Sequence, residues 1–302
     1  MAMGIATTPS LTPDALRVFT GCHTPTGMRV LERCAVPNAT LAVGDPGPWT
    51  ERAQAMGCFT APIDLLQNDG VDRLSLRLID THVRVFHPLT MLPTSDLLRS
   101  TATVLAALGR SGAVVERFVL GGSACVWRSR HHRWSVGDAS FLPPAASARS
   151  GAYAACESLA LRALPNVLTR LRSAPLWDAT ERGLATRLNR RWMPQPKQGR
   201  ALLDPLMVDD WVDAVARAMD ADARANGAVF GLPGPHALPA KALAAKVGAK
   251  AFAMPSGVSE LLGSFKLFGW DRDTALIMAW TLTLSGSGAW SILGWEAKRP
   301  LP

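Results

Sequence analysis

The sequence predicts an α/β fold in which a doubly wound parallel sheet is followed by a small, mainly helical C-terminal lobe. Short β-rich runs alternate with helical patterns through most of the chain, and the first strand leads into a glycine-marked turn. Such alternation is typical of parallel sheets with crossover helices. The chain has 302 residues, of which 48% are hydrophobic and 19% charged. It can therefore bury a substantial core and is not expected to be disordered.

The first strand, turn, helix and second strand form the clearest unit. A β-rich run at 16–19 precedes the turn, helical spacing covers 28–34, and a second β-rich run covers 39–43. Asp45 follows this run, 18 residues after Gly27. Dinucleotide-binding βαβ units place an acidic residue about 20 residues after the glycine turn, where it binds a ribose hydroxyl. The unit therefore predicts a nucleotide site at this turn.

The alternation continues toward the C-terminus. We expect further strands at 59–64, 83–88, 117–120, 166–172 and 229–232, and helices at 97–108, 153–164 and 208–219. The last of these helices is entered through Asp209 and Asp210, acids that suit a helix N-terminus. The predicted domains are a dinucleotide-binding core over 1–178 and a second part over 179–302. That second part adds the rest of the core, at about 201–235, and the small lobe.

Charge and cysteine usage limit the ligands and compartments that fit. The net charge is +8 and most of the positive residues are arginine. This suits an anionic ligand, an acidic partner or nucleic acid, but a GC-rich genome also produces an arginine excess, and we prefer that interpretation. The five cysteines lack zinc-ligand spacing, so we expect reduced, buried thiols inside the cell and no metal. Neither a secretory signal nor a transmembrane span is evident, and cytoplasm and mitochondrion both stay open.

Two arginine-rich clusters and a group of tryptophans offer surfaces for partners. The clusters at 128–134 and 187–192 contain both arginine and tryptophan, a combination that can bind nucleic acid. We prefer solvated loops, because no nucleic-acid-binding module is recognisable. Trp270, Trp280 and Trp290 lie among glycines and apolar residues. They are expected to pack in the core or lobe, the alternative being a docking face for a partner or a membrane surface.

Five segments occur in an order that is typical of one superfamily. They are residues 20–27, 117–127, 171–183, 207–212 and 293–298. Together they resemble the motifs of the extended short-chain dehydrogenase/reductases, especially the branch of the 3β-hydroxysteroid dehydrogenases and NAD-dependent sugar-nucleotide epimerases. The resemblance spans nearly the whole chain. It implies a Rossmann-like fold, a site for NAD or NADP and an oxidoreductase-like active site.

The resemblance places Thr20, Gly21, Thr24 and Gly27 in the cofactor turn. Thr24 stands where the family has its middle glycine, and the following Pro25 has no N–H to donate. A side chain at this point narrows the approach of a pyrophosphate to the helix N-terminus. Cofactor binding is therefore expected to be weakened, rearranged or absent.

Three further residues complete the cofactor site that the resemblance implies. Asp45 would accept the adenosine ribose hydroxyls and repel a 2′-phosphate, which favours NAD over NADP. Asp64 would lie near the adenine, and His87 matches a histidine at the end of a strand. The alternative is structural: the glycines serve tight packing, Asp45 is a turn residue and His87 packs at its strand end.

The catalytic residues are where the chain departs from the family. A serine or threonine, a tyrosine, and a lysine four residues after the tyrosine share the proton transfer there. Ser123 matches the serine, but Tyr153 is the only tyrosine and no lysine precedes Lys197. If Tyr153 is the family tyrosine, Glu157 takes the place of the lysine. If Tyr153 takes the place of the lysine, Arg149 takes that of the tyrosine, and the spacing to the next strand favours this second alignment.

These departures favour a protein without standard catalysis. An arginine, with a pKa above about 12, is not a proton donor near neutral pH. We interpret the chain as a degenerate NAD(P)-binding protein that acts as a scaffold or accessory subunit of a larger complex. The nucleotide-binding accessory subunit of respiratory complex I, in mitochondria, has that role in the same superfamily. The alternative is an active NAD-dependent oxidoreductase or epimerase-like enzyme that uses Ser123 with His87 or Tyr153, and a nucleic-acid-binding protein ranks third.

Overall fold

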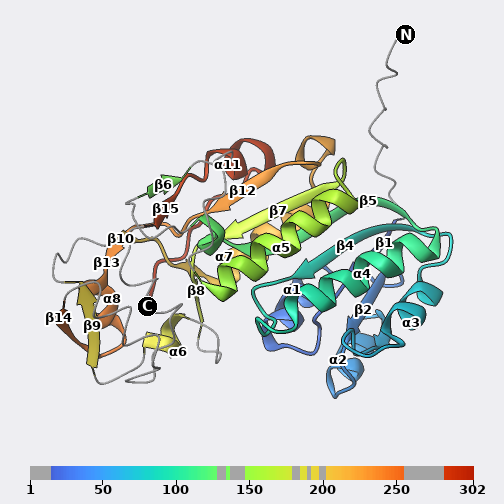
Figure 1. The fold of residues 1–302 in the computed structure, drawn as a ribbon, viewed down its shortest axis with the longest axis horizontal. Coiled ribbons are helices and arrows are strands. Elements are labelled where there is room, and N and C mark those ends of the chain that lie inside the picture. Colours follow the sequence, from blue (N-terminus) through green and yellow to red (C-terminus); the bar gives the residue numbers. More distant parts are fainter. Residues whose placement is uncertain are drawn as a thin grey trace, which may run out of the picture.

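A seven-stranded parallel sheet forms the centre of the molecule (Figure 1). The computed structural model describes residues 15–127, 134–136, 147–178, 184–188, 192–196, 202–254 and 282–302. From one edge to the other, the strands are β12 (Val229–Leu232), β7 (Leu168–Ser173), β5 (Val114–Ser123), β4 (His82–Pro88), β1 (Leu16–Phe19), β2 (Thr40–Gly44) and β3 (Phe59–Pro62). The chain order reverses between β1 and β4, so this sheet is doubly wound, as expected.

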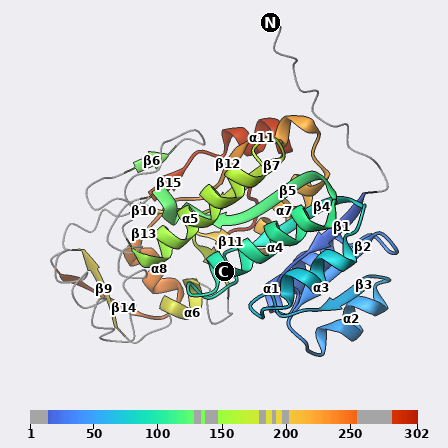
Figure 2. The same ribbon diagram turned by 45° about the vertical axis from the view of Figure 1, so that its right-hand side comes forward.

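Helices cover both faces of the sheet (Figure 1; Figure 2). On one face α1 (Pro25–Cys34) packs against α7 (Val208–Asp220). The other face carries α3 (Gly70–Arg77), α4 (Leu97–Ser111) and α5 (Ala148–Ala163), each in contact with the next. The short helix α2 (Trp49–Ala55) lies beside β3. The Rossmann-like arrangement predicted from the alternating pattern is therefore confirmed.

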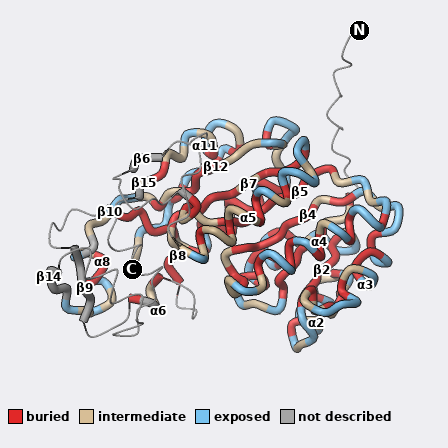
Figure 3. Tube along the Cα trace, viewed as in Figure 1, coloured by how far each residue is buried: buried red, intermediate tan, exposed pale blue. Residues whose placement is uncertain are grey.

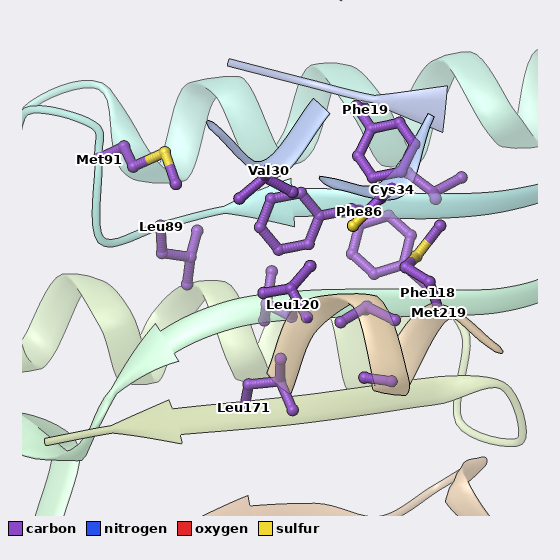
Figure 4. Packing of buried hydrophobic residues seen from close by; sticks show 14 of the residues in the cluster. Phe19, Val30, Cys34, Phe86, Leu89, Met91, Phe118, Leu120, Leu171 and Met219 are labelled. Atoms are coloured by element: carbon purple, nitrogen blue, oxygen red, sulfur yellow. The ribbon is translucent and has the colours of Figure 1, made fainter. Parts of the chain in front are cut away.

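The core lies between the sheet and these two helix layers (Figure 3). All five residues of β2 are buried, as expected of a strand that is covered on both faces. Phe19 and Phe86 lie 6.2 Å apart between ring centroids, and Trp211 of α7 meets Phe86 edge-on at 5.9 Å. Figure 4 shows the two phenylalanines with Phe118 and with aliphatic side chains that include Val30 of α1, Leu120 of β5 and Leu171 of β7. The aromatic residues thus join the centre of the sheet to α7.

Arg117 shows that one of the family-like segments has a structural role. It lies on β5 and is fully buried. Its guanidinium donates hydrogen bonds to the Asn226 side chain and to the carbonyls of Ala218, Ala221 and Asp222, at 2.5–2.9 Å. These bonds satisfy carbonyls at the C-terminus of α7. Burial lowers the pKa of Arg117 to about 10, and it stays charged at neutral pH.

A C-terminal clasp joins two segments that are far apart in the sequence. Asp210, near the start of α7, is buried. Its carboxylate accepts the backbone N–H groups of Lys298 and Arg299 at 3.0 and 2.8 Å and pairs with the Arg299 guanidinium at 2.6 Å. The Trp295 indole donates to the Asp210 carbonyl at 3.0 Å. The acidic helix start expected from the sequence is therefore a tether for the chain end.

The smaller part of the molecule has its own apolar cluster, made by Trp177, Leu184, Leu188, Leu203, Leu243 and Ala244. Its helices are α6 (Leu184–Leu188) and α8 (Ala240–Lys246), and α11 (Ser287–Leu293) returns to the main core. Short strands accompany them: β6 (Trp134–Val136), β8 (Leu176–Trp177), β9 (Trp192–Pro196), β10 (Leu202–Leu203), β11 (Leu206–Met207), β13 (Leu238–Pro239), β14 (Lys250–Met254) and β15 (Leu282–Leu284). Helices thus follow the main sheet, and the domain boundary at 178 stays a prediction.

The cysteines are free thiols, as expected. Four of the five are buried, and burial raises the pKa of Cys22 and Cys34 to about 12. These two thiols are therefore unreactive near neutral pH. Among the helices that the structure describes, none is long and apolar enough to cross a membrane.

Candidate functional site

The candidate site lies at the carboxyl edge of the main sheet. Because the strands are parallel, the segments that follow them meet at this edge. They bring together Thr20 and Gly21 after β1, Asp45 after β2, Asp64 after β3, Leu89 and Thr90 after β4, and Ser123 at the end of β5. The strand order reverses between β1 and β4, and ligands of doubly wound sheets bind at such a reversal.

The two glycines of the turn are required by packing whether or not a ligand binds. Gly21 has φ +74°, and a Cβ there would lie 2.9 Å from Pro88 Cγ. A Cβ on Gly27 would lie 2.1 Å from the Gly21 carbonyl oxygen. A left-handed φ and these close approaches both exclude larger residues. The predicted turn is therefore present, but its glycines alone do not distinguish a nucleotide site from tight packing.

Thr24, in place of the middle glycine, is the N-cap of α1. Its hydroxyl oxygen accepts the Gly27 N–H at 3.0 Å and donates to the Gly21 carbonyl at 2.8 Å. Pro25 occupies the first helical position. A threonine cap followed by proline is a favourable helix start. The start of α1 is therefore stabilised by hydrogen bonds between groups within the turn.

Asp45 faces solvent where the family-like site has its ribose acid. Its side chain is 51% exposed. The Asp45 backbone N–H donates to His23 Nδ1 at 3.2 Å, and His23 Nε2 lies 3.7 Å from the carboxylate. Partial burial raises the pKa of Asp45, and the nearby His23 acts in the opposite direction. His23, which the sequence did not single out, therefore contacts the one exposed acid closest to the glycine turn.

Asp64 closes a turn of its own after β3. Its carboxylate accepts the Leu66 N–H at 2.8 Å and the Gln67 side-chain amide at 3.0 Å. These two bonds lower the pKa of Asp64. Asp64 is therefore ionised at neutral pH, half-buried, and positioned on the same sheet edge as Asp45.

His87 and Thr20 point into the interior. His87 is fully buried: Nδ1 lies 2.7 Å from the Thr20 hydroxyl and Nε2 lies 3.1 Å from the Thr101 hydroxyl. Both ring nitrogens of His87 therefore have a hydroxyl partner, and the Thr101 hydroxyl also donates to the Leu97 carbonyl at 2.7 Å. Burial lowers the pKa of His87 to about 4. The geometry matches the packing interpretation of this histidine.

The tyrosine is also bonded inside the protein. Tyr153 lies on α5 and is 1% exposed. Its hydroxyl donates to the Leu89 carbonyl at 3.2 Å and accepts from Arg149 Nη2 at 3.1 Å. The Arg149 guanidinium also lies over the ring, 5.5 Å from its centroid. The two side chains predicted for catalysis are therefore in direct contact, four residues apart on one helix face.

Glu157 continues this face of α5 and forms a buried ion pair. Both Glu157 and Arg172 of β7 are 3% exposed. Arg172 Nε donates to one carboxylate oxygen at 3.0 Å and Nη2 donates to the other at 2.5 Å. A bidentate pair of this kind satisfies both groups away from water. Glu157 thus anchors α5 to the sheet.

Ser123 is half-buried at the end of β5. Its hydroxyl accepts the Cys125 N–H at 3.3 Å, at the start of the 3₁₀ turn η1 (Ala124–Trp127), against which α5 packs. A serine hydroxyl at the end of a strand often bonds a backbone N–H of the following turn in this way. In the described ranges, no three histidine, cysteine or acidic side chains gather to hold a metal ion.

Several predicted surfaces lie outside the described residues. The cluster at 128–134 falls there except for the backbone of Trp134, and so do Trp270 and Trp280. No side chain of the cluster at 187–192 is described apart from Leu188. Trp290 lies on α11 and is 66% exposed, so the prediction that it packs in the core or lobe is wrong.

Comparison with known proteins shows the fold. No family model matches the chain, and no curated protein matches it by sequence. The structure is similar to UDP-glucuronic acid 4-epimerase from Bacillus cereus in complex with UDP-glucuronic acid and NAD, with TM-score 0.66, 16% identity and coverage of 94% of this chain and 95% of that one. It is also similar to ADP-L-glycero-D-manno-heptose-6-epimerase from Helicobacter pylori, with TM-score 0.64, 12% identity and coverage of 95% of this chain and 93% of that one. A third similar structure is the terminal R domain from the myxalamid PKS-NRPS biosynthetic pathway, with TM-score 0.71, 14% identity and coverage of 95% of this chain and 86% of that one.

These structures are extended short-chain dehydrogenase/reductases and NAD-dependent epimerases. The resemblance suggested by the five motif segments is therefore confirmed at the level of the fold. The identities of 12–16% are too low to transfer an activity.

Proposed function

We propose that this chain, which has the Rossmann-like fold of the extended short-chain dehydrogenase/reductases, is a degenerate member of that fold group. In this proposal it retains the adenosine-facing part of an NAD site and lacks the tyrosine–lysine proton transfer. It serves as a scaffold or accessory subunit of a larger complex.

The observation that supports this proposal best is the internal bonding of Tyr153. Its hydroxyl hydrogen is directed at the Leu89 carbonyl, and the group four residues earlier is Arg149. A guanidinium supplies charge but does not exchange a proton near neutral pH. The ion pair of Glu157 with Arg172 makes Glu157 the structural acid of α5, which favours the alignment that puts Tyr153 in the place of the lysine.

The residues present fit one half of a dinucleotide better than the other. Asp45 and Asp64 are ionisable acids at the strand ends, suitable for ribose hydroxyls and the adenine amino group. At the diphosphate position, Thr24 bonds the Gly27 amide and Pro25 has no N–H. A bound nicotinamide would supply hydride chemistry, but no lysine from the segment before Lys197 is available beside its ribose.

The retained motifs support a scaffold role because their side chains hold the fold together. Arg117 satisfies the end of α7, and Asp210 holds the chain end through Arg299. Glu157 and Arg172 join α5 to β7. Each of these groups bonds other parts of the protein, in agreement with a structural role.

The active-enzyme alternative has no comparable support. It requires a proton donor at the edge, and His87 is buried with both nitrogens bonded and its pKa lowered to about 4. Tyr153 is buried as well. Of the three residues predicted for catalysis, Ser123 is half-buried at the end of β5 and keeps a hydroxyl at this edge.

Calorimetric titration with NAD and NADH, followed by an assay for hydride transfer, tests the proposal. We expect dinucleotide binding without transfer, and co-purification of the native protein in a larger assembly. Hydride transfer that falls more than about 100-fold in Ser123→Ala would contradict the proposal, because a catalytic hydroxyl contributes on this scale. Absence of binding at millimolar NAD would remove its nucleotide part.

A further inference from the structure

The hydroxyl of Thr24 occupies the anion-binding position of helix α1. The N-terminus of a helix attracts phosphate because its first N–H groups have no partner within the helix. Here the Gly27 N–H is bonded to Thr24 Oγ1 at 3.0 Å. The same hydroxyl donates to the Gly21 carbonyl at 2.8 Å and lies 3.4 Å from the Met91 sulfur. The hydroxyl is therefore held from three sides within the turn.

Few amides remain for a diphosphate. Pro25 has no N–H, and the Met28 N–H bonds the Thr24 carbonyl at 3.0 Å. Within the described part of the chain, the Thr26 N–H is the one amide of the first turn without a partner. A dinucleotide would gain a bond to Gly27 only by displacing Thr24, which would break the bond from this hydroxyl to Gly21.

Of the two acids assigned to the adenosine part, Asp45 is not closed in this way. The Asp45 side chain is 51% exposed. Asp64 is half-buried and uses its carboxylate in a local turn. The Asp45 carboxylate contacts the turn at the His23 ring, 3.7 Å away, and not at Thr24. Ribose hydroxyls can therefore bond the exposed side of Asp45 without displacing the Thr24 hydroxyl. The nucleoside and diphosphate parts of the edge therefore differ in how free their polar groups are.

We infer that Thr24 acts as a built-in competitor for the diphosphate, so this edge binds a nucleoside such as adenosine about as tightly as it binds NAD. The inference rests on the proposed function and specifies its ligand class. The hydroxyl is a neutral acceptor tied to the helix, and a diphosphate must displace it before it can use the Gly27 amide. The diphosphate therefore adds little to affinity, although it carries the charge that a helix N-terminus ordinarily favours.

Calorimetric titration of adenosine and NAD into the wild-type chain and into Thr24→Gly and Thr24→Ser tests the inference. Glycine frees the Gly27 amide and costs only a few tenths of a kcal/mol as a cap. Serine retains the hydroxyl and is the matched control. We expect NAD to bind Thr24→Gly about tenfold or more tightly than wild type, since a charge-assisted hydrogen bond contributes on this scale. Adenosine affinity should stay within about twofold, and Thr24→Ser should behave as wild type.

Three results would overturn the inference, and adenosine separates them from failure of the proposed function. Wild-type NAD affinity more than about tenfold above that of adenosine would show that the diphosphate is already bound, and would leave the proposed function intact. If adenosine binds and NAD affinity does not rise in Thr24→Gly, Thr24 does not compete with the diphosphate, and the proposed function is again left intact. If neither adenosine nor NAD binds to the wild type or to Thr24→Gly, the nucleotide part of the proposed function is removed as well. Urea unfolding of each variant establishes that it is folded.

Discussion

The carboxyl edge of the sheet has two halves that treat polar side chains in opposite ways. After β2 and β3, Asp45 and Asp64 remain partly exposed. The Asp45 carboxylate lies 3.7 Å from the His23 ring, and the Asp64 carboxylate accepts hydrogen bonds within its own turn. On the side of β4, β5 and α5, the polar side chains of α5 and β7 are buried or half-buried and are bonded to one another. Tyr153 and Arg149 make one pair there, and Glu157 makes another with Arg172.

The difference separates polar groups that remain exposed to solvent from polar groups that stabilise the fold. Binding and catalysis need polar groups that are accessible to a ligand, whereas a stable fold needs its buried polar groups to have hydrogen-bond partners within the protein. The second half of the edge meets the requirement for stability without any ligand. The first half still presents acids to solvent. Replacing residues on each side therefore has different expected consequences, the largest of which lie in the second half.

Arg172→Ala is expected to have the largest effect. It leaves the Glu157 carboxylate buried without its bidentate partner, and an unpaired buried charge costs about 3–5 kcal/mol of unfolding free energy. Urea unfolding measures this loss. The double variant Glu157→Gln with Arg172→Met should recover most of it, because no charge then remains buried. A loss below about 1 kcal/mol in Arg172→Ala would contradict the buried character of this pair, since the pair would then be open to water.

His87 is expected to make stability depend on pH. Its pKa falls from 6.5 to about 4 on folding, so the unfolded chain binds the proton more readily. The contribution of His87 to the unfolding free energy is fully present above pH 6.5 and is lost as pH falls toward 4, by about 3 kcal/mol in total. Urea unfolding between pH 7 and pH 4 measures the profile, with His87→Gln as the control that removes this contribution. Parallel profiles for the two chains would show that His87 is accessible to protons in the folded state.

Tyr153→Phe is expected to cost about 1–2 kcal/mol of unfolding free energy. The buried Leu89 carbonyl loses its donor, and Arg149 loses an acceptor. The dissociation constant for NAD should stay within about twofold, because the phenol faces the interior. A tenfold change in that constant would contradict the comparison by placing the hydroxyl against the ligand.

Asp45→Asn should change the unfolding free energy least of these variants, and its main effect should be on adenosine affinity. The side chain is half-exposed, so unfolding free energy should shift by less than about 0.5 kcal/mol. Adenosine affinity should fall about tenfold, since an ionised acceptor is replaced by a neutral amide. Glu51→Gln removes the same charge from the exposed face of α2 and is the matched control. Equal effects of the two variants would indicate a general charge effect and not a contact.

Some features of the site follow from local sequence alone. The strand at 16–19, the glycine turn and Asp45 were predictable, because alternation and glycine spacing reflect neighbouring residues. Thr24 followed by Pro25 also carries a local signal, that of an N-cap with proline at the first helical position. Helices α2 and α3 were not predicted, since seven and eight residues are too few to show a clear apolar period. Strand β5 runs three residues beyond its predicted end and includes Ser123.

Other features depend on contacts between distant segments. The sequence contains Glu157 and Arg172 but does not reveal that they form a buried pair. It places Asp210 at a helix start, where local rules predict an exposed capping acid, and only the folded chain brings Arg299 to it. His23 also gained its role from tertiary structure, because β2 runs beside β1 and brings Asp45 next to the turn.

By itself, the sequence determined the doubly wound fold, the position of the glycine turn and the absence of a lysine before Lys197. These depend on residue type and spacing, which act within one element or between neighbours. Only the tertiary structure decided which polar groups are free and which are bonded. That outcome depends on burial, because a hydroxyl or carboxylate removed from water bonds whichever partner the packing places beside it. Tyr153, bonded to Leu89 and Arg149 in the interior, is the clearest instance.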